Sequence, residues 1–160
     1  MSLDFNSRGN LIGTSPIQID FDTFVETFAF TKERKLLSDN YVKYNSYLID
    51  ILGKIDFYQW IDGSYVTRKT DPKDIDIVSF VDFEVYEKVA ASSNKLKNEI
   101  IKEKFNLDTR FVAIYPENHP KYFSFQADSA YWYNWFSKTN PKHDRRRRKY
   151  LKSFIQINHK

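Results

Sequence analysis

The sequence contains no cysteine, which excludes a disulfide scaffold, a thiol nucleophile and a zinc site with thiolate ligands. Its three histidines, His119, His143 and His159, lack the spacing of a metal-binding helix or hairpin, which argues against a histidine zinc centre. No apolar run approaches the roughly 18 residues that cross a bilayer, and residues 1–10 lack the apolar core of a signal peptide. We therefore expect a cytoplasmic protein without a membrane partner, in which carboxylates would carry any metal chemistry.

Glycine and proline are also scarce, with four and five residues, and neither forms a flexible linker. The 160 residues are 41% hydrophobic and 18% aromatic, which suits one domain with a core and not two. We expect a single domain over residues 1–160, with an irregular N-terminal arm over about residues 1–22. Residues 141–160 carry eight Lys/Arg against the single acid Asp144, and this basic segment suggests a polyanionic partner.

Hydrophobic periodicity predicts an α/β (α+β) fold, in which helices cover a short mixed β-sheet. Strands are expected at residues 57–61, 75–81, 107–115 and 154–157, the second of them covered by helices on both faces. Three helical regions lie between them or near them: 32–52, ended by Gly53, then 82–105 with a break near Ser92, and about 127–137. A further short helix is expected from Thr23, with Thr23 and Glu26 as a capping box.

Two groups of polar residues lie at the ends of the expected strands, one at the start of the strand at 75–81 and one after the strand at 57–61. Asp74 and Asp76 are one residue apart on an expected strand, so both carboxylates would project from the same face. Magnesium commonly binds one or two carboxylates together with waters and substrate phosphates. Gly63 and Ser64 end the preceding strand, where glycine lets a phosphate approach the backbone and serine adds a hydroxyl donor.

The two groups together resemble a known signature. Trp60-Ile61-Asp62-Gly63-Ser64, nine residues, then Asp74-Ile75-Asp76-Ile77-Val78 is similar to the motif of the nucleotidyltransferase superfamily of DNA polymerase beta type. The fuller string, with Tyr65-Val66-Thr67, Lys69 and Pro72, resembles a poorly characterised branch of small, stand-alone prokaryotic members. That similarity extends from Asn6-Ser7-Arg8-Gly9-Asn10 to Trp135-Phe136.

This resemblance implies a nucleotidyltransferase fold and a set of roles. Asp74 and Asp76 would bind the catalytic Mg²⁺ (or Mn²⁺), the Gly63-Ser64 turn would hold a nucleoside triphosphate, and Asp108 would be the third acid. The reaction would transfer a nucleoside monophosphate to a hydroxyl or phosphate acceptor, with Asp108 as metal ligand and base. Arg68, Lys69 and Lys73 lie in the spacer, where each suits contact with the β- and γ-phosphates or a solvated loop equally well.

Two further features have alternative interpretations. Arg145, Arg146, Arg147, Arg148 and Lys149 would contact RNA, DNA or an acidic partner, or would form a solvated connector. Trp132, Trp135 and Phe136 have the i, i+3, i+4 spacing of a buried helical face, which favours core packing over base stacking.

Three functions remain in competition. The first is an enzyme that adds a nucleotide to a small molecule, a protein or RNA. The second is a catalytically silent interaction module, such as the antitoxin of a toxin–antitoxin pair, with a cognate toxin or a second copy as partner. The third is an RNA-binding protein that uses the basic segment and only borrows the fold. The acceptor and the preferred base cannot be read from the residues.

Overall fold

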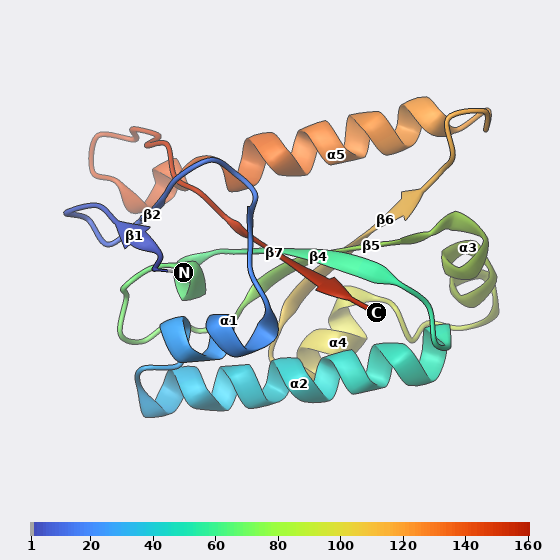
Figure 1. Cartoon of the computed structure of the whole chain (residues 1–160), viewed down its shortest axis with the longest axis horizontal. Coiled ribbons are helices and arrows are strands. Elements are labelled where there is room, and N and C mark those ends of the chain that lie inside the picture. Colours follow the sequence, from blue (N-terminus) through green and yellow to red (C-terminus); the bar gives the residue numbers. More distant parts are fainter. Residues whose placement is uncertain (1) are drawn as a thin grey trace.

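A five-stranded mixed sheet separates two layers of helices in the computed structural model, which describes residues 2–160 (Figure 1). The strand order is β3-β7-β4-β5-β6. Neighbours are parallel in the pairs β3/β7 and β5/β6, and antiparallel in β7/β4 and β4/β5. This arrangement confirms the expected α+β class with a short mixed sheet. The strands are β3 (Ile17–Gln18), β4 (Phe57–Asp62), β5 (Asp76–Asp82), β6 (Asp108–Ile114) and β7 (Ile155–His159).

Four helices cover one face of the sheet. They are α1 (Phe21–Phe28), α2 (Lys32–Leu52), α3 (Phe83–Ser92) and α4 (Asn98–Phe105). Tyr41 and Leu48 of α2 are fully buried in the larger core cluster, together with Ile61 and Ile77 of the sheet. The periodicity therefore placed α2 correctly, and Gly53 ends it with a φ of 84°, a conformation that glycine adopts without steric cost. The break between α3 and α4 also lies where it was expected.

The helix α5 (Tyr122–Phe136) lies alone on the opposite face (Figure 1). It packs against a smaller core cluster that includes Trp60, Val78 and Val112. Because side chains alternate along a strand, β5 is apolar on both faces, as predicted. The helix begins at Tyr122, five residues before the expected start at about 127. It starts directly after the turn that holds Pro116 and Pro120, where the Tyr122 N–H donates to the His119 carbonyl at 3.0 Å.

The N-terminal arm is more ordered than expected, and the prediction of an irregular arm was wrong. The two-residue strands β1 (Asp4–Phe5) and β2 (Leu11–Ile12) form an antiparallel hairpin, and β3 joins the main sheet. Fully buried Leu11 anchors this arm in the larger core cluster. The Thr23–Glu26 capping box was also wrong: Asp20 caps α1, accepting from the Thr23 N–H at 2.7 Å, so the helix begins at Phe21.

Two short 3-10 helices complete the fold, η1 (Ser64–Val66) and η2 (Pro141–His143). Asp82 caps α3, with its side chain accepting from the N–H groups of Glu84 and Val85. Within residues 2–160, no helix combines the length and the apolar character that crossing a membrane requires.

Candidate active site

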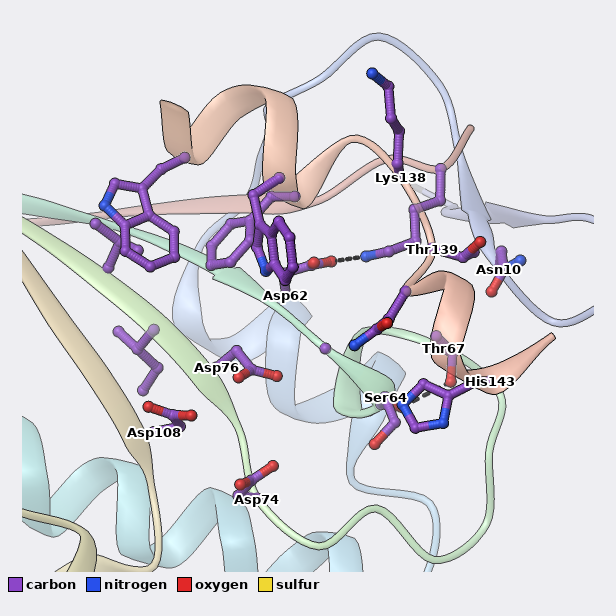
Figure 2. A pocket seen from close by; sticks show the side chains of 18 of the residues that line it. Asn10, Asp62, Ser64, Thr67, Asp74, Asp76, Asp108, Lys138, Thr139 and His143 are labelled. Carbon is purple, nitrogen blue, oxygen red and sulfur yellow. Dashed lines mark hydrogen bonds and ion pairs between the residues drawn. The ribbon is translucent and has the colours of Figure 1, made fainter. Parts of the chain in front are cut away.

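Three carboxylates stand side by side at one end of the central strands. Asp62 pairs with Asp76 across the antiparallel β4/β5 ladder, and Asp76 pairs with Asp108 across the parallel β5/β6 ladder. Residues that pair in register project to the same face of a sheet. That face is the one covered by α5, since Trp60 and Val78 lie two residues further along their strands and pack in the α5 cluster. Figure 2 shows the three side chains facing one cleft.

Asp74 completes the acidic group from a neighbouring position. The expectation that it lies on the strand was wrong, because β5 begins at Asp76 and Asp74 sits in the extended segment just before it. Its carboxylate nevertheless lines the same cleft. The side chain of Asn106 donates to the Lys73 carbonyl at 2.9 Å, which holds this segment against the end of α4. Lys102 of α4 lies 3.7 Å from the Asp74 Oδ2 atom.

Negative charge accumulates around Asp76. Burial, together with the nearby charges of Asp74, Asp62 and Asp108, raises the pKa of this carboxyl to about 7. A group that is held partly protonated by desolvation and by like charges becomes fully ionised when a cation binds beside it. Asp76 is therefore the residue of this cleft that gains most from a bound cation.

Asp62 and Lys152 form a buried ion pair next to Asp76, and the sequence analysis assigned a role to neither. Each side chain is only 7% exposed. Burial raises the pKa of Asp62 to about 6, an effect that Lys152 opposes. No local signal in the sequence connects the two, because they lie 90 positions apart. The alternation of β4 alone could have shown that Asp62 shares a face with Trp60.

The Gly63-Ser64 turn lies against the acids as the motif predicts. Gly63 adopts a φ of 78°, and a Cβ atom at this position would overlap the Asp76 carboxylate. Glycine is therefore required here both by the backbone conformation and by the close approach. The next residues form η1, whose first N–H groups have no partner within the helical turn. Ser64 lines the cleft beside these groups (Figure 2), which forms a site suited to phosphate oxygens.

Arg34 of α2 fixes this turn from beneath, and the sequence analysis missed it. The guanidinium is fully buried, and burial lowers its pKa to about 10. No acid pairs with it among its hydrogen-bond partners, which are the backbone carbonyls of Phe28, Ser64, Tyr65, Thr67 and Lys69 at 2.7–3.2 Å. A single side chain thus ties α2 to both ends of η1 and to the loop that follows it.

The acids and the turn open into a cleft of about 950 Å³ between the sheet, α5 and residues 138–152. Of the three spacer cations, Lys69 and Lys73 line the cleft. Arg68 does not, because its guanidinium stacks over Phe5 at 4.6 Å and Phe30 at 5.2 Å. Lys149 also lines the cleft, whereas Arg145, Arg146, Arg147 and Arg148 lie exposed in the segment beside it.

The aromatic run of α5 is only partly buried. Phe136 and Trp132 pack in the smaller core cluster as expected. Trp135 does not, since it is 50% exposed and lines the cleft. The prediction of core packing was therefore wrong for Trp135: the helix lies along the rim of the cleft, so this side of it has no sheet to cover it.

The donor atoms fit a magnesium or manganese ion that also binds substrate. Within residues 2–160, no three histidine or acidic side chains are grouped closely enough to enclose a metal by themselves. Mg²⁺ needs only one or two carboxylates when phosphates and waters complete its octahedron. Asp74 and Asp76 supply such hard oxygen ligands beside the Gly63-Ser64 turn, and Asp108 lies next to Asp76 in register. These residues could hold a divalent cation.

Comparisons with known proteins identify a family without a described activity. No curated protein and no solved structure matches the chain. One family model, described as a family of unknown function (DUF6932), matches residues 3–158. Since the match spans nearly the whole chain, the protein belongs to this DUF6932 family.

Proposed function

We propose that the protein is a metal-dependent nucleotidyltransferase with the fold of the DNA polymerase beta type. The observation that carries the proposal is the convergence of Asp74, Asp76 and Asp108 with the Gly63-Ser64 turn on one cleft. The register of β4, β5 and β6 accounts for this convergence. Because a nucleoside triphosphate is the proposed substrate, we place the protein in the cytoplasm.

The chain's own residues divide the work of transfer between them. Ser64 and the N–H groups of η1 bind the β- and γ-phosphates, and Lys69 and Lys73 neutralise their charge from the cleft wall. Mg²⁺ or Mn²⁺ held by Asp74, Asp76 and Asp108 would supply Lewis-acid stabilisation to the attacking and leaving oxygens.

The transfer step forms one bond and breaks one bond. An acceptor oxygen attacks the α-phosphorus, a new P–O bond forms, and the bond to the β-phosphate oxygen breaks so that pyrophosphate leaves. When the acceptor is a hydroxyl, Asp108 accepts its proton and passes it to water. Arg110 donates to the Asp108 Oδ1 atom at 2.7 Å, which orients the carboxylate.

The first test is calorimetric titration with ATP, GTP, CTP and UTP, in Mg²⁺ and in chelator. We expect binding only with metal, because four carboxylates would repel a free triphosphate. The second test follows α-phosphate label onto protein, RNA and small-molecule pools. Asp108→Asn should keep most of the triphosphate affinity and lower transfer at least about a hundredfold. Equal binding in chelator would contradict the proposed site.

One observation favours a second function, a silent interaction module such as an antitoxin. Three of the four acids already have a cation beside them in this structure: Lys152 at Asp62, Lys102 at Asp74 and Arg110 at Asp108. Because these cations offset the negative charge of the carboxylates, the site can be stable without metal. Tight Mg²⁺–triphosphate binding without label transfer to any pool would favour this module, with a cognate toxin or a second copy as its partner.

A further inference from the structure

Two exposed aromatic side chains of α5 line the cleft on the side away from the core. Tyr131 is 59% exposed and Trp135 is 50% exposed. They are four residues apart, so they lie one above the other on the same side of the helix. Both border the cleft that holds the acids. Large aromatic rings that face a polar cleft and cover no core are available to stack on a planar ligand.

The basic segment is tied back to this same cleft. The Thr139 N–H donates to the Tyr150 carbonyl at 2.8 Å, and the Lys152 N–H donates to the Ser137 carbonyl at 3.0 Å. Residues 138–151 therefore leave the end of α5, carry the arginine run outward and return to the cleft. The arginine run is consequently held in a loop whose base borders the cleft, and Lys149 of this loop lines the cleft together with Tyr131 and Trp135.

A second arm of the chain adds to this positive surface. Arg8 from the β1–β2 hairpin stacks over the Tyr150 ring at 3.7 Å, and Arg148 stacks over the same ring at 5.2 Å. The only acid of residues 141–160, Asp144, is paired with Arg148. Apart from Lys152, which is buried beside Asp62, the remaining cations of the segment face solvent without an acid of their own segment to balance them.

We propose that these elements form one binding surface for the end of a single-stranded polynucleotide. Bases stack on Tyr131 and Trp135, while Arg145 to Arg148 and Lys149 contact the phosphates. This inference rests on the proposed function, because it makes the terminal hydroxyl or phosphate of that strand the acceptor oxygen that attacks the α-phosphorus.

Charge and shape favour this ligand over two others. An acidic protein would use the arginines but would leave the aromatic rings without a role. A duplex keeps its base faces stacked inside and could not use them either. Exposed aromatic rings beside a basic track are the combination by which proteins hold single strands without reading their sequence. The cleft beside these rings is also lined by buried Asp62 and half-buried Asp76. Their carboxylates would repel further phosphates, so the strand ends there.

The test measures fluorescence anisotropy of labelled 12-nucleotide strands in chelator, without triphosphate. The ligands are single-stranded RNA, single-stranded DNA, duplex DNA and polyglutamate. We expect the single strands to bind most tightly, with the RNA and DNA arms showing which sugar is preferred. Polyglutamate or duplex binding as tight as that of the single strands would overturn the proposal, as would no binding of either single strand.

Two sets of variants assign the contacts. Tyr131→Ala with Trp135→Ala should weaken single-strand binding about tenfold or more, the usual scale of lost base stacking. The matched control is Phe123→Ala, which removes an 80% exposed ring from the same helix outside the cleft.

Changing Arg145 to Arg148 to Gln should flatten the slope of log affinity against log salt by up to about 3. Its control changes four lysines of α2 and the turn after it (Lys32, Lys35, Lys43, Lys54).

The outcomes separate this inference from the proposed function. Asp76→Asn should not weaken single-strand binding in chelator, because it removes only a negative charge, while it abolishes metal-dependent triphosphate binding. Strand binding that survives both the aromatic and the arginine changes would overturn the surface, whatever the titrations with triphosphate show. Loss of triphosphate binding alone would instead contradict the enzyme and leave the binding surface intact.

Discussion

The backbone of Gly63 lies so close to the carboxylate of Asp76 that any Cβ atom at position 63 would overlap it. The turn that would hold phosphates and the acid that would hold metal are thus in direct contact. A change in the position of one moves the other. The two halves of the motif therefore act as one unit.

Gly63→Ala should abolish metal-dependent triphosphate binding. The side chain would displace Asp76, and the φ of 78° would add about 1–2 kcal/mol of backbone strain. Gly53→Ala is the matched control, since Gly53 has a similar φ of 84° and nothing within 4 Å of its Cβ position. Both variants should lose stability in urea unfolding through backbone strain, and Gly63→Ala should lose more because of the overlap with Asp76. Retained triphosphate affinity in Gly63→Ala would show that the turn does not form the site.

Asp76→Asn should stabilise the metal-free protein at high pH. Its folded-state pKa, about 7, lies above the unfolded value, so the ionised form penalises folding. The penalty is absent below about pH 4, grows as the pH rises and is complete above about pH 7. In chelator at pH 8 we expect a gain in unfolding free energy on the order of 2–4 kcal/mol, and none at pH 4. Asp56→Asn, at an exposed acid, is the control, and an equal effect of both changes would refute the prediction.

Arg34→Lys should loosen the phosphate-binding turn. A lysine ammonium has three donors and cannot replace the Arg34 guanidinium, which donates to five carbonyls. Each buried carbonyl left without a donor lowers the free energy of unfolding by about 1–3 kcal/mol. We expect lower stability together with weaker triphosphate binding. Tyr41→Phe is the control on the same helix, because it removes a buried hydrogen bond to Gln59 away from η1. If both variants lose triphosphate affinity in proportion to stability, Arg34 has no specific positioning role.

His159 should make the fold sensitive to mild acid. Its ring stacks on Phe57 with centroids 4.5 Å apart, Nε2 lies 2.8 Å from Gln59 Oε1, and burial lowers its pKa to about 4. The unfolded chain takes up a proton more readily, so this contribution to stability is complete above about pH 6.5 and declines as the pH falls toward 4. Between pH 7.5 and pH 4.5 the free energy of unfolding should fall in the wild type by about 2 kcal/mol more than it falls in His159→Gln. Parallel pH profiles would exclude the effect.

The sequence predicted correctly those elements that depend on residues lying close together in the chain. The apolar spacing of α2 and the two-sided apolar character of β5 follow from burial along one segment. The motif found Gly63, Asp74 and Asp76 because they lie close together in the chain, and only the resemblance pointed to Asp108. The irregular arm was wrong because β3 gains its hydrogen bonds from β7, which is distant in sequence. The Thr23 cap was wrong because Asp20 accepts from the Thr23 N–H instead.

The missed site residues are those that long-range pairing defines. Asp62 joins the acids through strand register, which the sequence of β4 does not specify. Arg34 reads as a surface cation of an amphipathic helix, yet its partners are carbonyls about 30 positions away. Trp135 has core spacing, but the sheet ends beneath it, so burial depends on where the helix lies and not on its period.

The position of β7 has a consequence for how the protein is made. This strand is the last along the 160 residues, yet it is inserted between β3 and β4, and Lys152 directly precedes it. A nascent chain that has reached only residue 150 exposes the edges of β3 and β4, which invite pairing with other strands. Asp62 would also have no lysine partner. The cleft is therefore completed only once residues 152–159 have been synthesised, and chains that stop before them would aggregate.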